Sequence, residues 1–330
     1  MRRFITALLV AGLSLLPTSC TKNAATGRSQ FVVLDVQREI ALGEQAAPQF
    51  LNENGGDIPS NEIRQYVSEI GFRLARSSER PELPWEFHVL DSGVINAFAL
   101  PGGKVFFSRG LLAKMDNEAQ VAAVMGHEVG HVTAKHIGEQ MGQAIIVQGI
   151  ATGLGVAGQV SDNSYLQVLG AGAQVGGGLY LLKFGRDQES EADRLGIRYM
   201  TANGYNPVGM MQVMEILKKE SGGGGAAEFL STHPDPGRRR DEAERLIIEK
   251  YPDYKDPARY TFNHDRFNAV VVNGLKRLPA PRHGSKRADG TIENRGLPPA
   301  LAKALELHKG CLCHPQQLVP SFAVEAKDVR

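Results

Sequence analysis

The sequence predicts an α+β domain that is mainly helical, with a small β-sheet or hairpin beside one central helix. Three observations lead to this fold class. Residues 36–50 and 61–75 place apolar side chains at the spacing of amphipathic helices. Residues 85–108 contain short runs rich in β-branched and aromatic residues, interrupted by a Pro-Gly-Gly turn signal. Residues 121–125 are all apolar, as expected of a buried helix.

The strand signals follow one another closely along the chain. The first strand is expected over 85–90. A hairpin comes next, in which 94–100 is joined to 104–108 by the Pro-Gly-Gly turn. The buried helix should begin near Asp116 or Asn117, because either side chain is a good N-cap. We therefore expect the hairpin and this helix to pack together.

The helix carries a His-Glu-x-x-His run that begins at His127. Residues four apart lie on one helix face, so the imidazoles of His127 and His131 can reach one metal ion. Glu128 stands beside them, where it can take a proton from a water molecule. The alternative, polar residues on a solvated helix face, fits poorly with the apolar run 121–125, because burial without partners is costly. We expect one zinc ion per chain, with Glu128 as the general base.

A catalytic zinc ion needs three protein ligands, and the best third candidate lies in the acidic segment 186–193. Acidic residues in a first helical turn are favoured by the helix dipole. Glu189 and Asp193 are four residues apart and share a face. Glu189 could bind the metal while Asp193 accepts a hydrogen bond from a ligating imidazole. The alternative is a solvated acidic face with Arg186 and Arg194 as ion-pair partners.

Three other side chains are candidates for minor roles. Glu191 points to another face of its helix and is the weaker ligand candidate. His136 lies five residues after His131, which is not a metal-ligand spacing on one face, so it is expected to be structural or to support a ligand. His233 lies before Pro234 in a loop, where functional residues are common. It could contact the tetrahedral intermediate, bind zinc in a resting state, or be an ordinary turn residue.

Several segments together resemble one known family, the periplasmic HtpX-like and BepA-like zinc metallopeptidases. This is metallopeptidase family 48, a gluzincin family that also holds the CAAX prenyl proteases. The similarity extends over residues 20–250. It rests on the strand and turn 96–103, the His-Glu-x-x-His run with His136, the Glu-x-x-x-Asp segment 189–193, the Ser-Thr-His-Pro loop with Arg239, and the segment 23–28.

The resemblance implies a zincin-type metalloprotease domain. Within it, Glu189 would be the third ligand and Asp193 its supporting partner, and His233 and Arg239 would lie near the active site. The implied activity is zinc-dependent endoproteolysis in the cell envelope, in the quality control of misfolded or outer-membrane proteins.

Peptides or unfolded proteins are the expected partners. An edge strand beside a metal-binding helix can accept an extended peptide as an added strand, so substrate is expected along Asn96, Ala97 and Phe98. The net charge of +1, with both signs interspersed, indicates no nucleic-acid partner. The alternatives are a chaperone-like binding protein with little proteolysis, a domain with a relic motif, and a zinc hydrolase of other substrates.

Residues 1–19 have the pattern of a signal peptide. They combine a basic start with an apolar run, 4–16, that is too short to span a membrane. Cys20 at the boundary suggests a lipoprotein, although Pro17 stands where Leu is usual; ordinary cleavage near Cys20 or Ala25 is the alternative. We expect an exported, periplasmic protein with a lipid anchor on Cys20, on the outer membrane rather than the inner.

The metallopeptidase domain is expected over 20–250. Within it, the Gly- and Ala-rich segment 142–182 approaches the length of membrane spans but is interrupted by Gln residues. A mobile helical hairpin that acts as a lid is favoured over a transmembrane pair. Residues 251–330 form a C-terminal extension, partly flexible, in which Cys311 and Cys313 have no assigned role; a disulfide between them would be strained.

Overall fold

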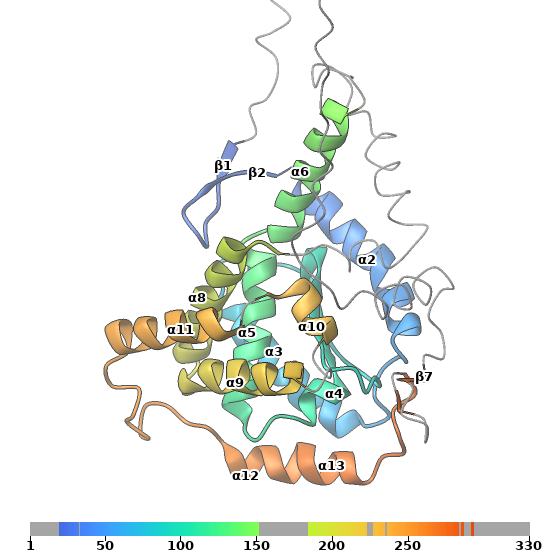
Figure 1. Ribbon diagram of the computed structural model, residues 1–330, viewed down its shortest axis with the longest axis vertical. Helices are drawn as coiled ribbons and strands as arrows, with labels where there is room; N and C mark the ends of the chain where they lie inside the picture. Colours follow the sequence, from blue (N-terminus) through green and yellow to red (C-terminus); the bar gives the residue numbers. More distant parts are fainter. Residues whose placement is uncertain are drawn as a thin grey trace, which may run out of the picture. The chain divides into compact units, whose positions relative to one another are not determined.

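The chain folds into a mainly helical α+β structure with a three-stranded sheet, which confirms the predicted fold class (Figure 1). The computed structural model describes residues 20–32, 34–151, 184–222, 227–234, 236–283, 285–286 and 292–293. The first elements are β1 (Cys20–Lys22), β2 (Ser29–Phe31), α2 (Val36–Glu53), α3 (Asn61–Arg76), β3 (Glu86–Leu90), β4 (Ala97–Leu100), the 3-10 turn η2 (Pro101–Gly103), β5 (Lys104–Ser108), α4 (Arg109–Leu112) and α5 (Glu118–Thr133). They are followed by α6 (His136–Ala151), α8 (Arg186–Ala202), α9 (Val208–Gly222), α10 (Ala227–Thr232), α11 (Pro236–Lys250), α12 (His264–Phe267), the π-helical turn η3 (Asn268–Val272), α13 (Asn273–Lys276), β6 (Ser285–Lys286) and β7 (Ile292–Glu293).

The long helices of the first half begin at polar capping residues. Asp35 caps α2, Ser60 caps α3 and Asn117 caps α5. Each side chain accepts a hydrogen bond from the backbone N–H three residues later, at 2.9, 3.3 and 3.0 Å. Such caps satisfy N–H groups that have no partner inside the helix. Of the two predicted starts of α5, Asn117 is therefore the cap.

The sheet has the strand order β3-β5-β4. Strand β3 runs parallel to β5, and β4 runs antiparallel to it, with Phe98 opposite Phe106. The turn between β4 and β5 places Gly102 and Gly103 at φ 72° and 88°, a left-handed conformation that glycine adopts without strain. This confirms the predicted hairpin. Strand β4 is an edge of this sheet, and all four of its residues are buried.

Helix α5 is buried along its whole length and runs between the sheet and α8 (Figure 1). Its packing against α8 depends on glycine. A Cβ atom added at Gly126 would lie 3.0 Å from the Gly196 carbonyl oxygen, and one at Gly130 would lie 2.9 Å from the Ala192 carbonyl oxygen. The two backbones therefore approach closely, which brings the side chains of α8 to the His-Glu-x-x-His face of α5.

Residues after 250, which were expected to form an extension, contact the helices of the domain. The backbone N–H of Glu118 donates to the Phe262 carbonyl at 2.9 Å. Phe267 and Val271 are buried in the same core as α3 and α5. The described part of this segment, up to residue 283, thus supports the start of α5.

Several expectations concern residues outside the described ones. These are the signal peptide 1–19, most of the segment 142–182, and the C-terminal residues that include Cys311 and Cys313. Within the part of the chain that is described, none of the helices combines the length and apolar character needed to cross a bilayer.

Candidate metal centre

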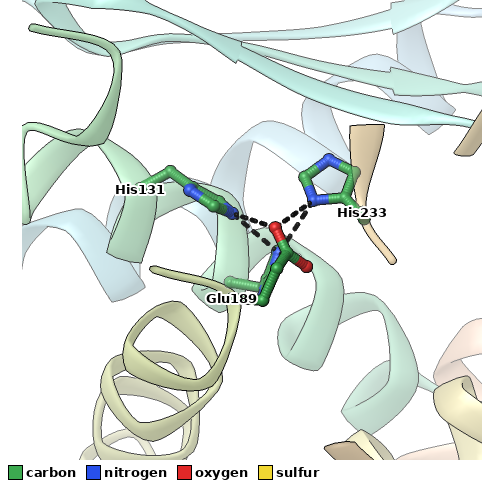
Figure 2. Close-up of side chains that lie close together, drawn as sticks. His131, Glu189 and His233 are labelled. Atoms are coloured by element: carbon green, nitrogen blue, oxygen red, sulfur yellow. Dashed lines mark hydrogen bonds and ion pairs between the residues drawn. The ribbon is translucent and has the colours of Figure 1, made fainter. Parts of the chain in front are cut away.

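Four buried side chains converge on one point of the structure. His127 and His131 extend from α5, Glu189 from α8, and His233 from the residue after α10, and one ligand atom of each lies within 4.8 Å of the others. Figure 2 shows His131, Glu189 and His233 turned toward one another. The structure therefore brings both histidines of the motif together with the predicted third ligand and with His233.

The distances identify which atoms face the shared point. The Nε2 atoms of His127 and His131 are 2.9 Å apart. Nδ1 of His233 lies 3.3 Å from Nε2 of His127 and 2.9 Å from Oε1 of Glu189. Oε1 of Glu189 is also 3.4 Å from Nε2 of His131. Four atoms that could bind a metal ion thus surround a common centre.

The hydrogen bonds on the far side of His127 and His131 fit a cation at this centre. Nδ1 of His127 is 2.8 Å from Oδ1 of Asp193, so it carries a proton, and its Nε2 keeps a lone pair. Nδ1 of His131 is likewise engaged, 2.9 Å from Nδ1 of His136. With a proton on each Nδ1, the two Nε2 lone pairs lie 2.9 Å apart, and a bound cation would satisfy both. Nitrogen and carboxylate donors in this number are typical of zinc.

Arg239 holds the two carboxylates that support the centre. It donates to both oxygens of Asp193 at 2.7 Å, and its Nη1 lies 2.5 Å from Oε2 of Glu189. Burial alone would raise the pKa of Glu189, but the charges of Arg239 and His233 hold that pKa well below its usual range. The pKa of Asp193 is lowered by Arg239 against the same effect. Both acids therefore remain charged although they are buried.

Glu128 lies beside the four ligand atoms and is fully buried. Among the described residues, neither of its carboxylate oxygens has a hydrogen-bond partner. Oε1 is 3.8 Å from Nε2 of His233. Burial raises the pKa of Glu128. A carboxylate with a raised pKa and free lone pairs is suited to accept a proton from a water molecule.

The structure gives Glu191 a contact that the sequence did not predict and brings Arg28, which the sequence did not single out, to the site. Glu191, the weaker ligand candidate, is 3.1 Å from Nε2 of His136 and accepts hydrogen bonds from Arg28. Burial would raise the pKa of Glu191, but His136 and Arg28 lower it to about 2. The three buried acids of α8 were a usable signal for Glu191. No local signal points to Arg28, which is 163 residues away in the chain.

Aromatic side chains cover the outer faces of the imidazoles. The ring of Phe184 stacks on His131 with centroids 3.9 Å apart, and Phe229 stacks on His233 at 4.6 Å. Both aromatic residues are buried. They fix the ring planes of the two histidines and keep the surroundings of the centre apolar. Neither was predicted, because the isolated aromatic residues carry no sequence pattern.

The predicted substrate strand lies at the sheet edge but is buried. Asn96 is 7% exposed, and Ala97 and Phe98 are 2% exposed each. The ring of Phe98 stacks against Phe50 of α2 at 5.2 Å. These side chains therefore belong to the packing of the described structure, and peptide binding along this strand would use its backbone edge.

Comparison with known proteins agrees with this geometry. The family model for peptidase family M48 matches residues 62–247, more than half of the chain. The β-barrel assembly-enhancing protease of Yersinia pestis is 30% identical over 235 residues, which cover 68% of this chain and 47% of that protein. The mitochondrial metalloendopeptidase OMA1 of Schizosaccharomyces pombe is 31% identical over 231 residues, which cover 68% of this chain and 65% of that protein.

The chain spans about half the length of the bacterial relative and about two thirds of the yeast one. The matched range contains the His-Glu-x-x-His helix, the acidic helix α8 and the loop of His233. The chain therefore belongs to peptidase family M48.

Proposed function

We propose that this protein is a zinc-dependent endopeptidase of the cell envelope. The observation that carries the proposal is the buried cluster of three imidazoles and one carboxylate, beside the carboxylate of Glu128, which has no hydrogen-bond partner among the described residues. A zinc ion held by these residues would supply Lewis-acid chemistry, polarising the peptide carbonyl and making water easier to deprotonate. His127, His131 and Glu189 are the proposed ligands.

Glu128 is the proposed general base. It would take a proton from the attacking water molecule and pass it to the leaving amine as the peptide bond breaks. Its position, with Oε1 3.8 Å from Nε2 of His233, and its raised pKa support this role. Asp193 and Arg239 would act indirectly, because they hold His127 and Glu189 in the orientation that binding requires.

His233 is proposed to act at the same centre. Its Nδ1 lies with the other ligand atoms, which favours metal binding in this conformation. Its Nε2 has no hydrogen-bond partner among the described residues. A displaced ring could use either nitrogen to contact the tetrahedral intermediate. The variant His233→Ala separates the two roles. If His233 is a metal ligand, the variant should lower zinc affinity. If His233 contacts the intermediate, the variant should lower kcat.

The proposed substrates are peptides or unfolded proteins, in quality control of misfolded or outer-membrane proteins. The proposed location is the periplasm, with a lipid anchor on Cys20. The support for substrate is the name of the bacterial relative, a β-barrel assembly-enhancing protease. The support for location is the signal-like sequence that ends before Cys20.

The decisive variant is Glu128→Gln. It keeps the size of the side chain and removes the base, so zinc should stay bound while cleavage of casein falls at least about a hundredfold. Glu249→Gln, at a side chain that is 73% exposed, is the matched control and should cleave as the wild type does. Cleavage by Glu128→Gln at the wild-type rate would refute the mechanism.

The same variant separates the enzyme from a chaperone-like binding protein. Zinc analysis and casein cleavage by the purified wild type come first. A binding protein would retain unfolded chains in both forms and cleave them in neither. For an enzyme, Glu128→Gln purified from its own envelope should retain bound proteins that the wild type cleaves, and mass spectrometry of these proteins would identify the substrates.

A further inference from the structure

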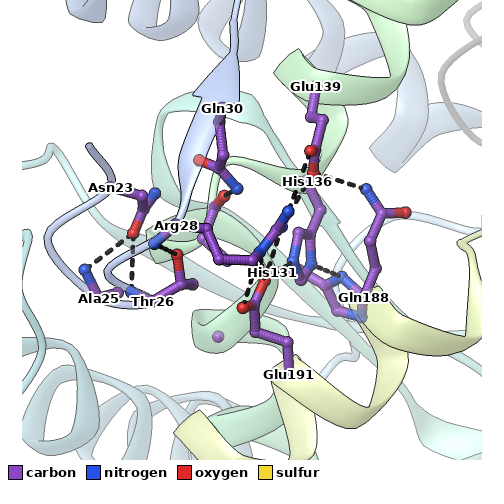
Figure 3. A network of polar contacts seen from close by, with 12 residues as sticks. Asn23, Ala25, Thr26, Arg28, Gln30, His131, His136, Glu139, Gln188 and Glu191 are labelled. Atoms are coloured by element: carbon purple, nitrogen blue, oxygen red, sulfur yellow. Dashed lines mark hydrogen bonds and ion pairs between the residues drawn. The ribbon is translucent and has the colours of Figure 1, made fainter. Parts of the chain in front are cut away.

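We propose that Arg28, Glu191 and His136 form a chain of hydrogen bonds that positions His131 for metal binding. The N-terminal segment that carries Arg28 is then a part of the metal centre, although it is far from the motif in sequence. The inference deepens the proposed function and rests on it, because it takes His131 to be a ligand. Figure 3 shows the network.

The contacts determine where each proton lies. Nε2 of His131 faces the centre and must keep its lone pair to bind a metal, so its Nδ1 carries the proton. That Nδ1 is 2.9 Å from Nδ1 of His136, which must therefore accept. Nε2 of His136 then carries a proton and donates to Oε2 of Glu191 at 3.1 Å. The charged carboxylate at the end thus selects one tautomer for both rings.

Arg28 fixes that carboxylate from the opposite side. Its Nε lies 3.0 and 3.1 Å from the two oxygens of Glu191, and its Nη2 lies 2.8 Å from Oε2. A planar guanidinium with several donors holds a carboxylate in one orientation, which a single ammonium group does not. Glu191 therefore presents its Oε2 to His136 in a defined direction.

The two histidines of the motif are supported in parallel ways. His127 donates directly to Asp193, and Arg239 holds Asp193. His131 reaches Glu191 through His136, and Arg28 holds Glu191. Carboxylates that receive the second proton of a ligating imidazole fix its tautomer and strengthen metal binding. The second arrangement is longer by one imidazole, and its arginine comes from the N-terminal segment.

The N-terminal segment is built to hold Arg28 in place. Oδ1 of Asn23 accepts hydrogen bonds from the backbone N–H groups of Ala25 and Thr26, at 2.8 and 3.1 Å, and closes the turn before Arg28. Nδ2 of Asn23 donates to the Thr133 carbonyl at 3.0 Å. These bonds tie the turn to the C-terminal end of α5.

A second bond ties the other strand of this turn to the same helix end. Nε2 of Gln30, in β2, donates to the Ala134 carbonyl at 2.8 Å. The last carbonyls of a helix lack partners inside it, so Asn23 and Gln30 provide them for α5. The segment therefore both ends the metal-binding helix and carries the arginine that acts on its second histidine.

The test uses a matched pair of carboxylates that Arg28 contacts. Glu191 belongs to the proposed chain. Glu139, 3.2 Å from Nη2 of Arg28, contacts the same arginine, but among the described residues it makes no hydrogen bond with His136 or His131. Glu191→Gln should weaken zinc binding about 10- to 100-fold in a chelator competition. Glu139→Gln should stay within about twofold of the wild type, because the ion pair is solvated on the Arg28 side and contributes little.

Arg28→Ala and Arg28→Lys test the end of the chain. Arg28 is 43% exposed, so Arg28→Ala should weaken zinc binding measurably, but by no more than about fivefold. Arg28→Lys keeps the charge without the bidentate geometry and should recover only part of this loss. If Glu191→Gln does not fold, this pair decides: equal zinc affinity of Arg28→Ala and the wild type overturns the proposal.

Nitrogen NMR of the histidine rings gives a readout that general loss of stability does not move. In the wild type, the proton of His136 should be on Nε2, and Glu191→Gln should shift the population toward Nδ1–H. Equal effects of Glu191→Gln and Glu139→Gln on zinc affinity would reduce the role of Arg28 to docking of the segment and overturn the proposal.

The ring tautomers and zinc affinity also separate this inference from the proposed function. If the wild type binds no zinc, the proposed function fails, whatever the tautomer of His136. If the wild type binds zinc and cleaves casein, while Glu191→Gln binds zinc as tightly, only the positioning role fails.

Discussion

The side chains that support the candidate metal centre are charges arranged in pairs, all of them buried except Arg28. Asp193 and Glu189 share Arg239, and Glu191 is held by Arg28. Removing one member of a buried pair leaves an uncompensated charge and is strongly destabilising, whereas an exposed pair contributes little. Variants at Arg239 are therefore expected to unfold the centre as a whole. Variants at Arg28, which is half-exposed, can be interpreted in a folded protein.

His88, away from the metal centre, should give stability a pH dependence. It lies between Asp57 at 3.2 Å and Glu86 at 3.3 Å. Burial lowers the pKa of His88, but the hydrogen bonds that its ring donates to the two carboxylates, together with their charges, outweigh this effect, and the pKa is raised. A raised folded-state pKa contributes stability that is full below the unfolded value of about 6.5 and is lost as the pH rises through the folded value.

The measurement is the difference in unfolding free energy between the wild type and His88→Gln, at zinc saturation, from pH 6 to pH 9. The difference should be largest at pH 6. Its size there should be about 1 kcal/mol or less, because the carboxylates are partly exposed. It should shrink toward pH 9. A difference that stays constant over this range would contradict the interaction.

At the scale of elements, the centre depends on the close approach of α5 and α8. The His-Glu-x-x-His face of α5 meets the acidic face of α8 because glycines stand at the contact. Larger side chains would separate the helices and move Glu189 away from His127 and His131. Gly126 and Gly130 lower the helix propensity of α5, at a cost of about 1 kcal/mol each. The close packing against α8 requires them and outweighs this cost.

Gly130→Ala tests this contact. The added Cβ would lie 2.9 Å from the Ala192 carbonyl oxygen, so one helix must shift. We expect an unfolding free energy lower by about 1–3 kcal/mol and weaker zinc binding, measured by chemical denaturation and chelator competition.

Gly237→Ala, in α11, is the matched control, because no atom of the described residues lies within 4 Å of its added Cβ. It should leave zinc binding unchanged and raise stability by up to about 1 kcal/mol. If Gly130→Ala and Gly237→Ala lose similar amounts of stability and zinc affinity, the α5–α8 contact tolerates a methyl group.

At the scale of the whole molecule, the centre joins three segments that are distant in the chain. The four clustered side chains come from α5, from α8 and from the residue after α10. A ligand that binds only the folded state stabilises it in proportion to the logarithm of its concentration. Zinc should therefore act as a cross-link between these segments.

Removal of zinc should lower the thermal stability of the protein. With free zinc at a hundred times its dissociation constant, the unfolding free energy should exceed that of the metal-free protein by about 2.7 kcal/mol. Thermal unfolding with a chelator, and again after zinc is restored, measures the effect. Glu189→Gln should respond less, and an unchanged melting temperature in the wild type would contradict binding at this cluster.

Much of the fold followed from local patterns. The helical periodicity predicted α2 and α3, the Pro-Gly-Gly signal predicted the hairpin, and the polar residues before the apolar run predicted the start of α5. The structure also brings Glu189 and Asp193 to the two histidines of the motif, where their four-residue spacing had placed them on one face. These features depend on neighbours within a few residues, which a sequence displays directly.

The sequence alone therefore determined the motif, its helix and its acidic partner helix, because a helical period fixes which residues share a face. The tertiary structure decided the rest. It placed Nδ1 of His233 with the ligand atoms, buried Glu191, and carried Arg28 to it across 163 residues. These contacts arise from the packing of α5 against α8 and of the N-terminal turn against the end of α5, and no local periodicity encodes a contact between distant segments.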